Sequence, residues 1–188
     1  MLKNITLPLT NEILKELRTG DSLLLTGLIY VGRDAVHERL TQAMDQGKQL
    51  PLEIAGAVIY YMGPSPARPN RVIGAAGPTT SGRMDSYAPR LIAAGLKGMI
   101  GKGMRSQSVI DAMIKYKAVY LGAIGGAGSL ISNSIVEAKI IAYPELGAEA
   151  LRLLNVKDFP VTVINDIYGG DLYREGKAKY QISSLIST

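Results

Sequence analysis

The sequence predicts an α/β fold built on a largely parallel sheet. Short apolar strands alternate with segments of helical periodicity, and several strands end in glycine-rich turns that lead into a helix. No internal repeat or linker divides the chain. Its 188 residues and 47% hydrophobic content suffice for one core, so we expect a single domain over residues 1–188.

The N-terminal half begins with a short helix expected over residues 10–17, where Thr10 or Asn11 would cap the first free N–H groups. The run SLLLTGLIYV at 22–31 predicts a strand, and apolar residues at helical spacing then predict a helix over 33–46. Two short strands, separated by a proline-rich loop, are expected at 57–62 and 71–76.

The C-terminal half continues the alternation of strands and helices. Strands are expected at 97–100, 118–123, 137–143 and 161–165. Helices are expected at 84–94, 106–116 and 148–154. The stretch from Gly169 onward is mixed and polar, and its pattern predicts no particular element.

Composition excludes several classes of site and partner. The chain has no cysteine and one histidine, His37, so it offers no disulfide, thiol nucleophile, histidine-rich metal site or self-contained iron–sulfur cluster, and we expect it to hold no metal. The net charge of +5 is scattered, without the basic stripe of a nucleic-acid surface. No apolar run approaches the ~20 residues of a membrane span, and no signal peptide is visible. A cytoplasmic protein without nucleic-acid or membrane partners is expected.

Basic residues follow three of the expected strands, at the edge where α/β proteins bind ligands. The first segment carries Arg33, Asp34 and His37 at a helix start. Arg33 and His37 are four residues apart and are expected on one helix face, with Arg33 able to bind a carboxylate or phosphate in a bidentate manner. In the alternative interpretation, Asp34 is a first-turn charge, Arg33 is solvated and His37 fills an interface.

The second segment is the run GPTTSGRMD at 77–85. The hydroxyls of Thr79, Thr80 and Ser81 and the free N–H groups of a helix start would form an anion site, to which Arg83 adds a full charge. Two or three charge-assisted hydrogen bonds, each of about 1.5–3 kcal/mol, would hold a small dianion. The alternative is an ordinary helix cap made by Thr80 or Ser81, which leaves the flanking glycines unexplained.

The third segment places Lys102 between Gly101 and Gly103, where the backbone is open to a ligand. The spacing does not match a Walker A loop, so an anion-binding lysine and a solvated loop lysine both stay open. A glycine cluster at 122–128 fails the register of a dinucleotide fingerprint and indicates close packing or a second anion site. Three acidic residues are expected on the solvated surface: Glu137, Glu145 and Glu149.

Taken together, these motifs resemble one family. The runs GPTTSGRMD (77–85) and GLKGMIGKG (95–103) are similar to the signature of the iron–sulfur-dependent hydro-lyases, the class I fumarate hydratases and L(+)-tartrate dehydratases. The run TGLIYVGRDAVHER (26–39) is similar to an upstream motif of that family. Shorter similarities occur at 63–69, 123–128 and 158–163. The resemblance covers nearly the whole chain, but only the C-terminal, or β, part of these enzymes.

The resemblance implies a swivelling β/β/α-type domain that acts as a β subunit. In this family a 4Fe–4S cluster is held by three cysteines of an α subunit or of an N-terminal domain. For a chain without cysteine it therefore implies a separate cluster-bearing α subunit, in an α2β2 assembly. The implied reaction is the reversible hydration of fumarate to L-malate, with the cluster iron as Lewis acid.

The resemblance also implies roles for individual residues. Family positions that match Arg33, Arg83 and Lys102 bind the dicarboxylate, and the position that matches Thr79 is a proposed catalytic base. A threonine hydroxyl is a weak base, so a carboxylate of the α subunit is expected to assist it. The supporting candidates are Asp34, His37, Thr80, Ser81 and Asp85.

Other functions stay open beside this one. An L(+)-tartrate dehydratase β subunit would use the same residues to convert tartrate to oxaloacetate. A stand-alone anion- or nucleotide-binding module would bind its ligand tightly without a partner and without chemistry. A purely structural partner would stabilise an α subunit, and replacing Arg83 would then spare turnover.

Overall fold

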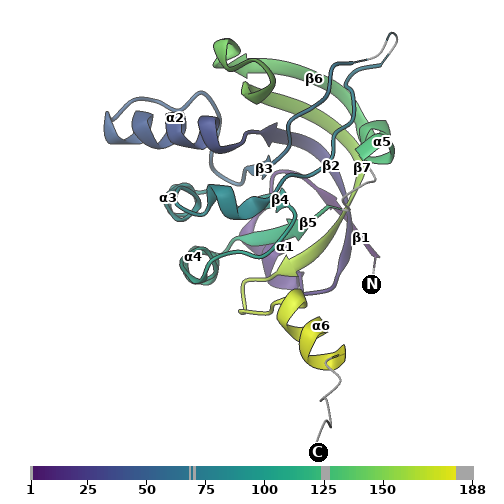
Figure 1. The fold of residues 1–188 in the computed structure, drawn as a ribbon. Helices are drawn as coiled ribbons and strands as arrows, with labels where there is room; N and C mark the ends of the chain where they lie inside the picture. The colour runs from purple at the N-terminus through teal and green to yellow at the C-terminus, as the bar shows by residue number, and fades with distance from the viewer. Residues whose placement is uncertain (1, 68, 70, 124–127, 181–188) are drawn as a thin grey trace, which may run out of the picture.

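The computed structural model describes residues 2–67, 69, 71–123 and 128–180. It is a mixed α/β fold whose seven strands form one sheet in the order β1-β2-β3-β4-β5-β7-β6 (Figure 1). The strands are β1 (Leu2–Thr6), β2 (Ser22–Val31), β3 (Val58–Tyr60), β4 (Gly98–Gly101), β5 (Val119–Gly122), β6 (Ile135–Ala142) and β7 (Leu151–Asn165). Strands β1 to β5 pair in parallel and β7 runs antiparallel to its neighbours, which confirms the predicted α/β class with a mostly parallel sheet.

Strand β7 closes the sheet into a ring, because it pairs with β2 as well as with β5 and β6. The successive pairings run from β2 through β3, β4, β5 and β7 back to β2. Along its other side, β7 pairs with β6 up to Val156 and with β5 from Thr162. Pro160, which has no N–H to donate, lies in the unpaired stretch between them, where a proline is tolerated as at a sheet edge.

Helices α2, α3 and α4 lie together on one side of the sheet (Figure 1). The α-helices are α1 (Asn11–Glu16), α2 (Asp34–Asp45), α3 (Ala88–Ala93), α4 (Gln107–Tyr116), α5 (Gly128–Ile131) and α6 (Leu172–Tyr180). Short 3-10 helices are η1 (Ser81–Met84), η2 (Ser132–Ser134) and η3 (Pro144–Glu149). No helix in the described ranges is both long and apolar enough to cross a membrane.

Two buried apolar clusters stabilise the fold, on opposite faces of the strands. One joins α1 to the strand ring and includes Tyr60, which packs edge-on against Phe159 with ring centroids 5.4 Å apart. The other lies under α2, α3 and α4 and includes Tyr61 and Tyr120. Consecutive strand residues point to opposite faces, so the pair Tyr60 and Tyr61 contributes one ring to each cluster.

Several local predictions are confirmed residue by residue. Thr10 caps α1, because its Oγ1 accepts a hydrogen bond from the N–H of Ile13 at 3.3 Å. Strand β2 covers the predicted range 22–31, and Gly27, with φ of 130°, marks a shift in its register with β7. The opposing bulge contains Asp158, a non-glycine residue with φ of 53°.

The strand predicted at 71–76 is wrong, since this segment is irregular. It folds back on the preceding loop, where Ser65 N–H donates to the carbonyl of Ala75 at 3.2 Å and Ala75 N–H donates to Ser65 Oγ at 2.8 Å. Ile73 and Ala76 are buried in the core, which explains why the run is apolar without belonging to a strand.

The helix predicted at 148–154 is also wrong, because most of that range belongs to β7. Leucine is a good helix former, but Leu154 pairs with Ile29 of β2 and with Ala138 of β6. This tertiary pairing overrides the local preference. The structure also contains the edge strand β1 and the helices α5 and α6, which the sequence pattern did not indicate. Residues 124–127 of the glycine cluster at 122–128 lie outside the described residues, as does residue 68 of the 63–69 motif.

Candidate functional site

The loops that the sequence singles out meet at one edge of the sheet. Strands β2, β3, β4 and β5 are parallel neighbours, so their carboxyl ends lie together. Arg33 follows β2 and Lys102 follows β4. The segment 79–83 returns to the end of β3, where the N–H of Thr79 donates to the carbonyl of Tyr61 at 2.8 Å.

A short parallel bridge joins the loop at 77–85 to the turn at 101–103. Thr80 pairs with Lys102, because the N–H of Ser81 donates to the Lys102 carbonyl at 2.9 Å and the N–H of Lys102 donates to the Thr79 carbonyl at 3.2 Å. Thr79 and Lys102 are therefore held side by side by backbone bonds. The Lys102 side chain is exposed and forms no ion pair with any residue that the structure describes.

Ser81 lies buried beneath this bridge and does not cap a helix. Its hydroxyl is 2.8 Å from the hydroxyl of Tyr120, which itself donates to the carbonyl of Gly103 at 2.9 Å. Since the Tyr120 proton is used on Gly103, Ser81 is the donor to Tyr120. A Cβ at Gly101 would overlap Ser81 Oγ, so only glycine allows this close approach. Thr80, at the start of η1, makes no side-chain cap either, so the predicted capping alternative is wrong.

Arg83 connects the loop at 77–85 to the segment between β2 and α2. Its Nη2 donates to Oδ2 of Asp34 at 2.5 Å, across the start of α2. The Arg83 side chain is 52% exposed, so a ligand at the sheet edge can reach the guanidinium. Asp34 thus acts on the site through Arg83, in addition to standing as the first-turn acid of α2.

Arg33 is the residue before α2, and its side chain is largely covered. Its Nη2 lies 3.0 Å from Oε1 of Glu149, and a Cβ at Gly63 would lie 2.9 Å from its Nη1. The expectation that Glu149 is simply solvated is wrong, because it neutralises Arg33. The pairing is long-range, and no spacing in the sequence indicates it.

His37 is a core residue under this loop. It is fully buried, its Nδ1 donates to the carbonyl of Arg33 at 2.8 Å, and its ring packs edge-on against Tyr61 with centroids 5.2 Å apart. Burial lowers the pKa of His37 to about 4, so the ring is neutral at pH 7. Arg33 is partly exposed whereas His37 is covered, so the two side chains do not present one common surface.

Asp85 has a structural partner that the sequence did not reveal. Its Oδ1 accepts from Nε of Arg105 at 2.7 Å, and its Oδ2 accepts from the N–H of Ser106, at the start of α4, at 2.6 Å. Arg105 is buried between the rings of Tyr61 and Tyr120, with its Cζ 5.4 and 5.0 Å from their centroids. Asp85 therefore compensates the charge of buried Arg105, and this pair has a structural role.

The Thr79 hydroxyl donates to the carbonyl of Tyr61 at 2.9 Å. Within the described ranges, no carboxylate is hydrogen-bonded to this hydroxyl. Together with Arg33, Arg83 and Lys102, it forms an edge that carries one hydroxyl and three cations, two of which are paired with Glu149 and Asp34. Such an edge can bind a small anion through Lys102 and through arginines that share or exchange their partners.

Comparison with known proteins gives this edge a family context. A family model described as "Fumarase C-terminus" matches residues 2–176. An anaerobic class I fumarate hydratase of Escherichia coli is 44% identical over 169 residues, which are 87% of this chain and 31% of that enzyme. The mitochondrial fumarate hydratase 1 of Leishmania major is 35% identical over 93% of this chain and 33% of that enzyme. A Methanocaldococcus jannaschii protein named as an L(+)-tartrate dehydratase subunit beta is 32% identical over 91% of each chain.

Proposed function

The chain belongs to the Fumarase C-terminus family, and on that premise we propose that it is the β part of a hydro-lyase that reversibly hydrates fumarate to L-malate. The chain spans about a third of the length of the fumarate hydratases it matches. The observation that carries the proposal is the bridge between Thr80 and Lys102, which sets Thr79 and Lys102 beside each other on the edge that also holds Arg33 and Arg83.

A dicarboxylate substrate matches the charges of this edge. Lys102 has no ion pair with a described residue, so a substrate carboxylate can pair with it directly. Arg83 is half-exposed and already bound to Asp34, so the second carboxylate would share or displace that partner. Arg33, held by Glu149, would complete the set. The expected binding mode is therefore two carboxylates on two neighbouring loops, with the carbon skeleton above Thr79.

In this proposal, a partner chain holds the 4Fe–4S cluster. This chain has no cysteine, so its residues do not fit such a cluster. No group of three or more histidine, aspartate or glutamate side chains in the described ranges could hold a metal ion. We assign the cluster to a separate α subunit in an α2β2 assembly, located in the cytoplasm. The family's swivelling β/β/α-type domain is the fold we assign to the strand ring and its helical layer.

Proton transfer is the role proposed for Thr79. Its hydroxyl proton is engaged by the carbonyl of Tyr61, so Thr79 needs a further group to accept or hold a proton during turnover. Asp34 is bound to Arg83 and Asp85 to Arg105, so neither of these nearby carboxylates is free for that task. A carboxylate of the α subunit is the group we expect.

An L(+)-tartrate dehydratase is the second candidate. The Methanocaldococcus jannaschii relative is named as a β subunit of that enzyme, and the two sequences match over 91% of each chain. The same cations would bind tartrate, whose hydroxyl groups distinguish it from fumarate. The residues of this chain do not separate the two substrates, so the experiment must.

The direct test is an anaerobic co-purification. We would tag this chain, recover it with its partners from its native cells and follow the loss of fumarate absorbance. Activity that appears with a cysteine-bearing, iron-containing partner and is absent from the chain alone supports the proposal. An intact iron-bearing partner with turnover of tartrate instead of fumarate selects the second candidate. Recovery of the chain without any partner contradicts the proposal and favours a stand-alone binding module.

Arg83 offers a variant with a matched control. Arg83→Met should lower kcat/KM by about ten- to a hundredfold, since a hydrogen bond to a charged group contributes roughly 1.5–3 kcal/mol. Arg90 forms an ion pair of the same length with Asp45, also 2.5 Å, and is similarly exposed on α3. Arg90→Met should leave kcat/KM unchanged. If both variants behave alike, Arg83 has no role in binding substrate and a structural role for the chain is favoured.

A further inference from the structure

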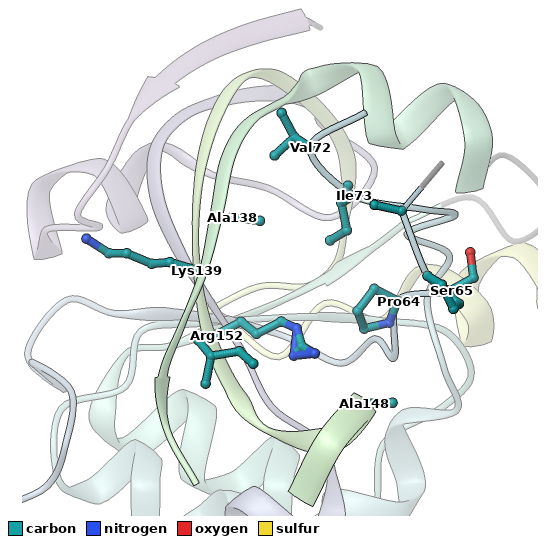
Figure 2. A pocket seen from close by; sticks show the side chains of 11 residues that line it. Pro64, Ser65, Val72, Ile73, Ala138, Lys139, Ala148 and Arg152 are labelled. Carbon is teal, nitrogen blue, oxygen red and sulfur yellow. The ribbon is translucent and has the colours of Figure 1, made fainter. Parts of the chain in front are cut away.

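A cavity of about 370 Å³ lies between the loop at 64–73, η3 and strands β6 and β7 (Figure 2). Its walls present both polar and apolar surface, and the apolar side chains include Pro64, Val72, Ile73 and Ile140. This volume is at the lower end of the range for small-molecule sites. Arg33, Arg83 and Lys102 do not line it.

The described lining of the cavity carries positive charge. Among the described residues that line it are Arg152 and Lys139, and none is an aspartate or glutamate. Figure 2 shows the Arg152 guanidinium directed toward Pro64, while the Lys139 side chain extends away from it. Arg152 thus directs one positive charge into the cavity, beside its apolar side chains.

Arg152 is uncompensated within the described part of the chain. Its Nη2 donates to the carbonyl of Gly147 at 3.1 Å, its Nη1 is buried without a hydrogen-bond partner, and it forms no ion pair with a described carboxylate. Burial lowers the pKa of Arg152, which reflects the cost of holding this cation away from water. A bound anion would offset that cost.

We propose that this cavity is a separate binding site for a small organic monocarboxylate, with its carboxylate on Arg152 and its apolar body against Val72, Ile73 and Ile140. A dicarboxylate would place its second charge among apolar side chains, and inorganic phosphate would leave the apolar walls uncovered. Two residues of the lining are next to residues around Arg33. Pro64 follows Gly63, where an added Cβ would meet the Arg33 side chain, and Ala148 precedes Glu149, which pairs with Arg33.

Calorimetric titration of the full chain with benzoate tests the proposal. Benzoate should bind, and both benzamide, which has the same shape without the charge, and inorganic phosphate, which has the charge without the body, should bind at least about tenfold more weakly. Absence of benzoate binding, or equal binding of benzamide, overturns the proposal.

Variants then locate the site. Arg152→Met should weaken benzoate binding by at least about tenfold, whereas Lys139→Met should leave it within about threefold. Val72→Glu keeps Arg152 and places a negative charge in the wall that should contact the apolar body, so it should weaken benzoate binding through charge repulsion and loss of apolar contact. Benzoate binding that is lost in Arg83→Met and kept in Arg152→Met would place the anion at the sheet edge and overturn the proposal.

Discussion

A single hydroxyl, that of Tyr120, joins the two loops of the candidate site. It accepts from Ser81, which belongs to the loop of Thr79 and Arg83, and donates to Gly103, which follows Lys102. Tyr120→Phe removes the shared group and leaves the buried Ser81 hydroxyl and the partly buried Gly103 carbonyl without this partner, at a cost of about 1–3 kcal/mol in the free energy of unfolding. We expect faster hydrogen exchange at the amides of Ser81 and Lys102 and a raised KM for substrate.

Tyr60 provides the control for this prediction. It is equally buried, and its hydroxyl donates to the carbonyl of Ala76 at 2.5 Å, but it lies in the other apolar cluster. Tyr60→Phe should also destabilise the protein, without faster exchange at Ser81 and Lys102. A Tyr120→Phe variant whose exchange at these two amides matches that of the wild type would contradict the role assigned to the hydroxyl.

His37 gives stability a pH dependence of known sign. Burial lowers the pKa of His37 to about 4 from the ordinary value of 6.5. Between these two pH values, His37 is protonated in the unfolded chain and neutral in the folded chain. The contribution of His37 to stability is complete above pH 6.5 and is lost progressively as the pH falls toward 4. The shift corresponds to roughly 3 kcal/mol in the free energy of unfolding.

Urea unfolding between about pH 7 and 5, where few carboxylates titrate, isolates this effect. His37 is the one histidine of the chain, so His37→Asn should flatten the pH dependence in that window while its amide keeps a donor for the Arg33 carbonyl. A histidine NMR signal of the folded protein that titrates near pH 6.5 would refute the prediction.

At the scale of elements, the end of β4 and the loop of η1 fit together only because Gly101 has no side chain. Gly101→Ala would place a Cβ against Ser81 Oγ and within 3.1 Å of the Tyr61 ring. We expect a loss of about 1–3 kcal/mol, typical of overpacking, and a separation of Thr79 from Lys102. Gly82→Ala is the control, because a Cβ there meets no atom within 4 Å. Thermal unfolding and fumarate turnover of the two variants should differ clearly; similar values would show that the close approach is unimportant.

The elements also show what sequence patterns can and cannot supply. The strand at 22–31 was predictable because its leucines and β-branched residues sit on a central strand and its glycine marks the bulge. The range 148–154 was not, because pairing with two distant strands decides its conformation. At the site, glycine-flanked cations were visible in the sequence. Two ion pairs of this region, Arg33 with Glu149 and Asp85 with Arg105, join residues from remote segments and leave no local signal in the sequence.

At the scale of the whole molecule, Asp166 joins the N-terminal segment that follows α1 to the C-terminal segment that follows β7. Its Oδ2 accepts from the N–H and the hydroxyl of Thr19, both at 3.0 Å. Its Oδ1 accepts from the N–H groups of Tyr168 at 2.8 Å and Gly170 at 3.0 Å. Burial acts to raise the pKa of Asp166, but these hydrogen bonds outweigh it, and the pKa lies below the ordinary aspartate value.

A carboxyl group whose pKa is lowered on folding stabilises the folded state at pH values above the ordinary aspartate pKa. This contribution is lost as the pH falls through the pKa of the folded state. Asp166→Asn should therefore cost roughly 1–3 kcal/mol in the free energy of unfolding near pH 7, and less at about pH 3, which is below the ordinary aspartate pKa. Asp45→Asn, at an exposed ion pair with Arg90, should have little effect at either pH. Urea denaturation of the three proteins at both pH values measures the difference. An Asp166→Asn cost that does not shrink in acid would mean that shape, and not charge, holds the two ends together.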